Sequence, residues 1–168
     1  AWTGKQNERT RAYLDGAASR AAIRDRIKGI LSSTSADRFA LHPVKDKLFA
    51  LKDQPPKQQP FLVVATAPDK AKTEADLKER VLVDPNAIDA TGGTTIDWFE
   101  PSPDGKLLAV SLSSGGSENG TVHVYDAETG KEQGDLVPFA HSGTAGGSLA
   151  WAADSKGFYY TRHPHAGE

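Results

Sequence analysis

The chain contains no cysteine and no methionine, and each absence narrows the interpretation. Without cysteine it can form no disulfide and no thiolate metal site, but this does not assign a compartment, so cytoplasm and periplasm both stay open. Without methionine the chain does not begin at a start codon, and we expect it to be a piece of a longer protein. No apolar run approaches the roughly 20 residues of a membrane-spanning helix, so we expect no membrane partner.

The charge is nearly balanced over the whole chain but is unevenly distributed. The 168 residues include 20 Lys and Arg against 22 Asp and Glu, a net charge of −2. This balance gives no global attraction to nucleic acid, which we therefore do not expect as a partner. Residues 1–32 contain seven basic and three acidic residues, which leaves 13 basic and 19 acidic residues for the remainder. The asymmetry indicates two structurally different segments.

The first segment has the periodicity of helices. A break is predicted at Gly16, and Ser19 is a suitable N-cap for the second helix. That helix carries one apolar stripe at positions i, i+4, i+7 and i+8, formed by Ile23, Ile27, Ile30 and Leu31. Basic side chains lie on or beside the opposite face, at Arg20, Arg24, Arg26 and Lys28. We interpret them as a solvated helix face rather than a nucleic-acid or lipid contact.

After about Ser32 the pattern changes to short strand-like runs separated by turn residues. Strands are predicted at 38–42, 47–52, 61–66, 80–83, 95–99, 107–112, 121–125, 136–139, 148–151 and 158–162. No second long helix is predicted, although the polar stretch Lys70–Leu77 could be a helix or a loop. Helices followed by a string of short antiparallel strands do not form a βαβ pattern, so a parallel sheet is not expected.

The strands group into repeats with the period of β-propeller blades, which have four strands per 40–50 residues. A tight turn recurs before the second strand of each repeat, as Lys45-Asp46-Lys47, Asp104-Gly105-Lys106 and Asp154-Ser155-Lys156. The apolar runs that follow are typical of strands covered on both faces by neighbouring blades. A β-sandwich is the competing architecture, but the spacings of the turns favour blades.

The predicted fold class is therefore mainly β with N-terminal α-helices, as a partial β-propeller. Residues 1–35 form the helical segment. Residues 36–168 form about two and a half four-stranded antiparallel blades: blades 1 and 2 and the start of blade 3. Because a propeller blade buries its faces only against neighbours, this number of blades does not close a ring. The incomplete ring and the missing methionine both indicate a fragment.

The sequence contains no convincing nucleophile motif. Gly146-Gly147-Ser148-Leu149-Ala150 resembles the G-x-S-x-G elbow but departs at its last position and leads into a predicted strand instead of a helix. Ser113-Ser114-Gly115-Gly116-Ser117 lacks the GK[ST] that follows a phosphate-binding loop, so we interpret it as a hairpin loop. The carboxylates Glu132 and Asp135 lie in a predicted loop and are interpreted as solvated.

The remaining candidates are also interpreted as structural. The five histidines, His42, His123, His141, His163 and His165, show no metal-ligand spacing apart from the close pair 163 and 165, which Pro164 places in a loop. Trp2, Trp98 and Trp151 are interpreted as packing residues. We predict no catalytic residue, no metal site and no cofactor in this chain, and the sequence identifies no substrate-binding residue.

A series of landmarks nevertheless resembles, along essentially the whole chain, the N-terminal part of the prolyl oligopeptidase family of serine peptidases. They are Trp2, Gln6-Asn7, Thr10, Tyr13-Leu14, the 20–31 helix, Val83-Asp84-Pro85-Asn86, the Phe99–Gly105 stretch, Ser111–Ser113 with Gly116-Ser117, Leu149–Trp151 and Lys156–Tyr160. The resemblance implies an α/β-hydrolase domain with a Ser-Asp-His triad, capped by a seven-bladed propeller that admits short peptides. It further implies that the helical segment packs on the peptidase domain.

By this resemblance the triad and the missing blades lie outside the chain, so the chain alone is predicted to be inactive. Its implied partners are the rest of the parent peptidase and, in the parent, short peptide substrates. Two departures concern substrate preference: the Gln54–Pro60 stretch replaces an expected hairpin, and Gly146-Gly147 stands where an aromatic residue is expected. The alternative function is a stand-alone propeller binding module of WD40 or TolB type. Self-association through unpaired blade faces is a further possibility.

Overall fold

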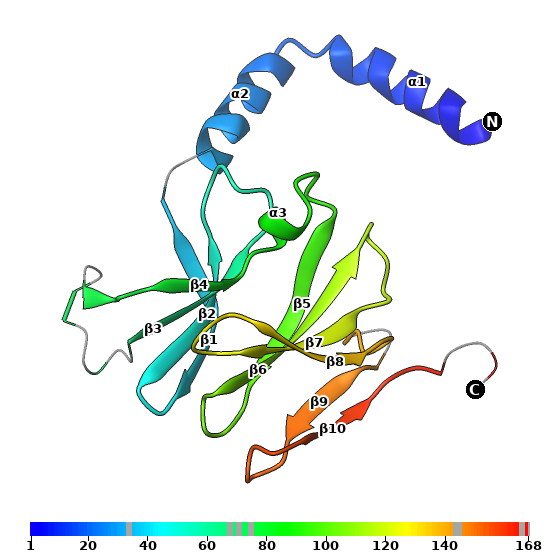
Figure 1. Ribbon diagram of the computed structural model, residues 1–168. Coiled ribbons are helices and arrows are strands. Elements are labelled where there is room, and N and C mark those ends of the chain that lie inside the picture. The colour runs from blue at the N-terminus through cyan, green and yellow to red at the C-terminus, as the bar shows by residue number, and fades with distance from the viewer. Residues whose placement is uncertain are drawn as a thin grey trace. The chain divides into compact units, whose positions relative to one another are not determined.

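A computed structural model describes residues 1–32, 35–66, 69, 72–73, 76–142, 146–164 and 167. His165 and part of the Lys70–Leu77 stretch lie outside the described residues. The chain divides into two compact units, Ala1–Ser35 and Ala36–Glu168, which are described separately (Figure 1). None of the described helices is long and apolar enough to cross a membrane.

The first unit contains two helices, α1 (Trp2–Asp15) and α2 (Arg20–Leu31), separated at Gly16 as the sequence predicts. Ser19 occupies the N-cap position of α2, but its side chain makes no capping hydrogen bond. An ion pair between Arg20 and Asp15 connects the two helices instead. Neither helix has a buried residue. The apolar stripe of α2 is thus exposed within this unit.

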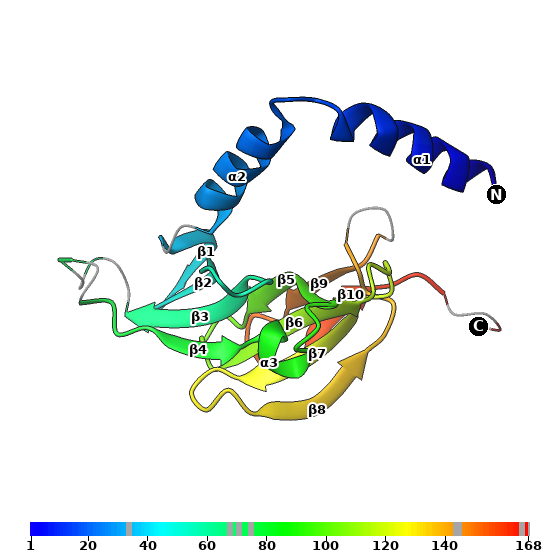
Figure 2. The ribbon, with the colours of Figure 1, turned by 90° about the horizontal axis from the view of Figure 1, so that it is seen from above.

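The described strands of the second unit form three antiparallel sheets in sequence order. The first sheet consists of β1 (Asp37–Val44), β2 (Lys47–Asp53), β3 (Phe61–Thr66) and β4 (Arg80–Val83). The second consists of β5 (Thr94–Pro101), β6 (Leu107–Ser114), β7 (Thr121–Asp126) and β8 (Glu132–Val137). β9 (Ser148–Trp151) pairs with β10 (Phe158–Thr161). Figure 2 shows β1, β5 and β9 toward one side of the unit and β4 and β8 toward the other.

This arrangement confirms a mainly β fold with N-terminal helices and the partial propeller. Two apolar layers join the sheets. Phe49 of β2 and Leu108 of β6, both fully buried, belong to the layer between the first and second sheets. Ala109, on the opposite face of β6, packs in the layer that includes Trp151 and Phe158 of the third sheet. β6 is therefore covered on both faces, because its alternating side chains enter two different layers.

The repeated turns have equivalent hydrogen bonds 50 residues apart. In the second sheet, Ser102 N donates to Leu107 O and Gly105 N donates to Ser102 O. In the third, Ala152 N donates to Gly157 O and Ser155 N donates to Ala152 O. Both turns place one residue at positive φ, Gly105 at 70° and Ser155 at 60°. The two turns are thus the same structure in successive blades.

The first turn is different, which corrects the prediction of three equivalent turns. Only Lys45 and Asp46 separate β1 from β2, so this connection is a two-residue hairpin in which Lys45 has the positive φ, 57°. The turns nevertheless contact one another across the sheets. Lys47 Nζ donates to Gly105 O at 3.3 Å, and Asp104 N donates to Ser155 Oγ at 3.1 Å. These contacts tie neighbouring blades together at the same edge.

Three local predictions need correction. β8 occupies Glu132–Val137 rather than 136–139, so Glu132 and Asp135 lie on a strand and not in a loop. A single helical turn, α3 (Pro85–Ile88), follows β4 where no helix was predicted; Asp84 caps it by accepting a hydrogen bond from Asn86 N. The Gln54–Pro60 stretch does not replace a hairpin: it connects β2 to β3, which pair from Lys47↔Thr66 to Lys52↔Phe61.

The aromatic residues also differ from expectation. Trp98 and Trp151 are packing residues, and their indole nitrogens donate to Ala140 O at 3.3 Å and Glu100 O at 2.9 Å. Trp2, however, is 75% exposed and belongs to none of the apolar clusters formed by the described residues. The run that includes Tyr159 was expected to be covered on both faces, yet Tyr159 is 77% exposed. Phe158 packs toward the second sheet, so Tyr159 points to the opposite face of β10, and no sheet among the described residues covers that face.

Candidate functional site

Ser148 does not lie in a nucleophile elbow. It begins β9, which pairs with β10 rather than leading into a helix. Its hydroxyl lies 2.8 Å from Thr161 Oγ1, a cross-strand partner in the same pair. No imidazole contacts it among the described residues, so this serine has a structural position in the sheet.

The four described histidines each contact a different group. His42 packs against the ring of Phe99, and His163 against the ring of Phe139. His141 Nε2 lies 3.6 Å from a carboxylate oxygen of Asp97. Within the described part of the chain no three His, Cys, Asp or Glu side chains form a group that could hold a metal ion.

Asp97 is the acceptor of a buried hydroxyl network in the second sheet. Its side chain is 5% exposed and accepts hydrogen bonds from Ser111 Oγ at 2.8 Å and Ser113 Oγ at 2.5 Å. Both serines donate to the carboxylate and neither contacts His141, so the group differs from a Ser-His-Asp triad, in which the serine donates to the imidazole. Gly120 lies against this network, where a Cβ would come within 2.5 Å of Asp97 Oδ2. We interpret the network as a structural element of the blade.

A second carboxylate, Glu79, connects the strands at the start of the propeller. It accepts hydrogen bonds from Arg38 Nε at 2.6 Å and Lys52 Nζ at 2.5 Å, and its side chain is 14% exposed. Burial raises the pKa of the Glu79 carboxyl, but hydrogen bonds from Lys52 and Arg38 outweigh it and hold the pKa below its ordinary value. Glu79 is therefore charged at neutral pH and joins β1, β2 and the segment before β4.

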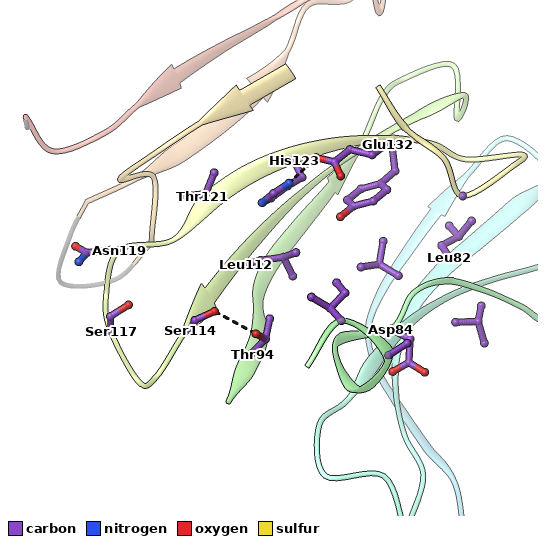
Figure 3. A pocket seen from close by; sticks show the side chains of 16 residues that line it. Leu82, Asp84, Thr94, Leu112, Ser114, Ser117, Asn119, Thr121, His123 and Glu132 are labelled. Carbon is purple, nitrogen blue, oxygen red and sulfur yellow. Dashed lines mark hydrogen bonds and ion pairs between the residues drawn. The ribbon is translucent and has the colours of Figure 1, made fainter. Parts of the chain in front are cut away.

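A groove of about 760 Å³ lies between the first and second sheets of the second unit (Figure 3). One wall is formed by β4 and α3 and is mostly apolar, with Val81, Val83, Ala87 and Ile88. The other wall comes from β6, β7 and β8 and is mostly polar, with Ser114, Thr121, His123 and Glu132. The groove is therefore amphipathic, with each wall supplied by a different blade.

His123 and Glu132 form a polar pair on the second wall. His123 Nδ1 lies 2.7 Å from Glu132 Oε1 across the β7–β8 pair. Tyr125, two residues along the same face of β7, stacks against His123 with ring centroids 6.3 Å apart. Burial and the nearby charge of Glu132 raise the pKa of Tyr125 to about 12. The phenol is therefore neutral over the physiological range and can donate a hydrogen bond.

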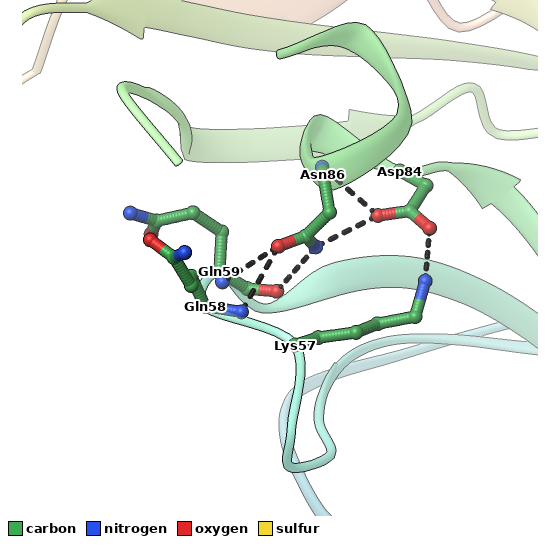
Figure 4. Close-up of polar contacts among 5 residues, drawn as sticks. All are labelled: Lys57, Gln58, Gln59, Asp84 and Asn86. Carbon is green, nitrogen blue, oxygen red and sulfur yellow. Dashed lines mark hydrogen bonds and ion pairs between the residues drawn. The ribbon is translucent and has the colours of Figure 1, made fainter. Parts of the chain in front are cut away.

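The opposite wall is fixed in place by the loop between β2 and β3 (Figure 4). Asn86 Oδ1 accepts hydrogen bonds from Gln58 N and Gln59 N, and Asn86 Nδ2 donates to Gln59 O. Asp84 pairs with Lys57. Burial raises the pKa of Asp84, but hydrogen bonds from Lys57 and Asn86 outweigh it and lower the pKa overall. This network holds α3 in position at the groove.

The sequence did not predict that these groove residues lie close to one another. His123 was considered as a metal ligand, and Glu132 was assigned to a loop. Because β8 carries a polar sequence, its pairing with β7 and hence the contact between positions 123 and 132 could not be read from apolar periodicity. The one available signal is the Val83-Asp84-Pro85-Asn86 stretch, an acidic residue before proline that is typical of a helix start.

The antiparallel sheets pack face to face in chain order, and the turn before the second strand of each sheet contacts the next such turn. This arrangement defines a segment of a β-propeller. The family model described as the prolyl oligopeptidase N-terminal beta-propeller domain matches residues 1–168. The chain therefore belongs to the prolyl oligopeptidase family, in the propeller domain of these peptidases. This confirms the resemblance found in the sequence and favours it over a stand-alone WD40 or TolB-type module.

Individual relatives agree with this assignment. Prolyl oligopeptidase A of Amanita bisporigera is 25% identical over 99% of this chain and 23% of the relative. The prolyl endopeptidase of Elizabethkingia meningoseptica is 31% identical over 55% of this chain and 12% of the relative. A solved structure of prolyl oligopeptidase B from Galerina marginata, bound to a 25mer macrocyclization substrate, superposes with a TM-score of 0.76. It is 25% identical over 98% of this chain and 24% of that protein.

A prolyl endopeptidase structure from a study of inter-domain dynamics has the same fold, with a TM-score of 0.79 at 24% identity over 99% of this chain. The chain covers 23% of that protein. It thus spans about a quarter of the length of the peptidases that it matches end to end.

Proposed function

We propose that this chain is the first part of the propeller cap of a prolyl oligopeptidase-type serine peptidase. In this proposal the cap admits short peptides to a peptidase domain outside these residues and excludes folded proteins. The observation that carries the proposal is the match of the family model to residues 1–168. It is supported by the relatives, which are about four times as long as this chain and include enzymes named for peptidase activity.

The catalytic residues would lie in the peptidase domain. There a serine would attack the peptide carbonyl, a histidine would accept its proton, and an aspartate would orient the histidine. The cleaved bond would typically follow a proline. The proposal is supported by the contacts of Ser148, whose hydroxyl lies against Thr161, and of Ser111 and Ser113, which donate directly to Asp97. The proposed contribution of the chain is selection of substrates by size.

We further propose that the helical segment docks on the peptidase domain. Its α2 exposes Ile23, Ile27 and Ile30 at 55%, 50% and 55%, all on one face of the helix. Exposure of such a stripe to water is unfavourable. Covering it would stabilise the protein by roughly 25 cal/mol per Å² of apolar surface buried. A peptidase domain is the cover that the family assignment suggests.

The test is to express the coding region at its full length and compare two substrates. One is a short Gly-Pro reporter peptide, and the other is the same bond placed in a folded protein. The proposal predicts cleavage of the first, its loss with a serine-directed inhibitor, and resistance of the second. Cleavage of both at similar rates would refute the size filter, and no serine-dependent cleavage would refute the peptidase assignment.

The docking role is tested in the same protein with two variants of α2. Ile27→Asn places an amide on the apolar stripe and should lower both thermal stability and reporter turnover. Asp25→Asn lies on the opposite face of the same helix and should leave both unchanged. Equal behaviour of the two variants would show that the stripe is not covered in the assembled protein.

A further inference from the structure

The groove between the first two sheets has the dimensions of a site for an extended chain. Thr121, His123 and Tyr125 alternate along β7, so their side chains point to the same face of the strand and line the groove together. Four residue steps at about 3.3 Å each give a floor roughly 13 Å long. The groove therefore accommodates about four residues of an extended peptide.

Its two walls suit the two faces of such a peptide. Val81 and Ile88 on the first wall are 48% and 56% exposed, although both are aliphatic, so apolar surface is left for a ligand to cover. The second wall offers hydrogen-bonding groups at regular intervals. Among the described residues no hydrogen-bond partner is found for His123 Nε2, while its Nδ1 lies against Glu132. An extended peptide, with alternating side chains and free backbone groups, can use both walls at once.

The charge of the groove selects among peptides. Its charged lining groups are Asp84 and Glu132, and within the described residues no lysine or arginine lines it. Lys57 pairs with Asp84 from outside the groove and offsets that charge. Glu132 is 44% exposed and its protein partner is an imidazole. This carboxylate is thus the group that a ligand cation would meet.

We propose that this groove binds an extended peptide segment in which a basic side chain alternates with aliphatic ones. The aliphatic side chains cover Val81 and Ile88, and the basic side chain pairs with Glu132. The groove is lined mainly by β4, α3, β7 and β8, and Thr94 at the start of β5 also lines it (Figure 3). The proposal concerns peptide binding by this groove and does not rest on the selection by size proposed above.

The experiment uses the 168-residue chain and two fluorescein-labelled probes, Val-Lys-Leu-Lys-Val and Val-Glu-Leu-Glu-Val, with fluorescence anisotropy as the readout. The basic probe should bind at least about 5-fold more tightly than the acidic one, and the preference should fall as salt is added. Absence of binding by the basic probe, or equal binding of the two probes, would overturn the proposal.

Two matched pairs of variants locate the binding. Glu132→Gln should weaken the basic probe about 2- to 5-fold, the range expected for an exposed charge pair, whereas Glu128→Gln in the adjacent turn should not. Ile88→Lys should weaken it about 10-fold, because it removes apolar surface and adds a like charge. Leu41→Lys is the control, since Leu41 on β1 is 55% exposed and does not line the groove.

Circular dichroism and the unfolding midpoint of each variant establish that it is folded. All four positions are surface side chains, so these variants are expected to fold. If the control variants weaken binding of the basic probe as much as the groove variants do, the probe binds elsewhere on the surface and the assignment is refuted.

Discussion

The Gly147→Ala substitution tests how the segment before β9 is held against the second sheet. Gly147 N donates to His141 O at 2.7 Å. A Cβ at position 147 would come within 2.6 Å of His141 O and closer still to the backbone carbonyl of Ala140. Real Cβ atoms do not approach other atoms within 3.0 Å, and a backbone carbonyl cannot rotate away as a side chain can. The substitution therefore forces the two backbone segments apart.

The expected cost follows from the contacts that this separation disturbs. Overpacking of a well-packed site costs about 1–3 kcal/mol. The displaced Ala140 carbonyl is also the acceptor for Trp98 Nε1 at 3.3 Å, and the Gly147–His141 bond is strained as well. Two weakened hydrogen bonds add about 1 kcal/mol each at most. We expect Gly147→Ala to lower the free energy of unfolding by about 3 kcal/mol, or roughly 6–12 °C in Tm for a chain of this size.

The control is Gly157→Ala, in the turn between β9 and β10. A Cβ there meets no atom within 4 Å, and its φ lies outside the left-handed region. It should leave stability unchanged or raise it by up to about 1 kcal/mol, because alanine restricts the unfolded chain. Urea unfolding followed by tryptophan fluorescence measures both variants. Equal midpoints for the two would refute the close approach of residue 147 to residue 140.

Three further predictions concern the core and two titrating groups. Leu108→Ala, at a fully buried position between the first two sheets, should lower the free energy of unfolding by about 2–5 kcal/mol in the same urea assay. Because the folded pKa of Glu79 is lowered, its stabilisation is present above its unfolded pKa of about 4.3 and is lost as the pH falls below it. Glu79→Gln should therefore be less stable than wild type at pH 7, and the difference should shrink as the pH falls from about 5 toward the lowered folded pKa; a difference that stays constant over this range would contradict this. Tyr125→Phe should hardly alter the absorbance change at 295 nm between pH 8 and pH 10.5, because a phenol with a pKa of about 12 is not ionised there.

The fold could be predicted from the sequence where local chemistry repeats. The turns at 102–107 and 152–157 share their hydrogen bonds because each places an acidic residue before one that accepts positive φ. The apolar runs of β2 and β6 identify strands buried on both faces. The first turn was predicted wrongly to be equivalent to the other two. Lys45-Asp46-Lys47 resembles them in composition, but only two residues connect its strands.

The groove could not be predicted, because its walls come from strands whose register the sequence does not specify. Glu132 to Asp135 are polar and exposed, so nothing in their pattern distinguishes a strand from a loop. β8 is a strand because it pairs with β7, for example at His123↔Leu136 and Tyr125↔Glu132. Tertiary pairing thus determines this element, and the contact of His123 with Glu132 follows from it.

The same arrangement explains why the blades are stable while leaving a groove between them. The layer that joins the first two sheets includes Leu82 and Tyr125, which also line the groove. Beyond them the second sheet continues as β8, whose first residues supply no apolar side chain to extend the layer. The groove therefore opens where the apolar residues of this layer end. Ile88 and Glu132 therefore lie outside the layer that stabilises the fold, so a change in peptide binding on their substitution would report the groove itself.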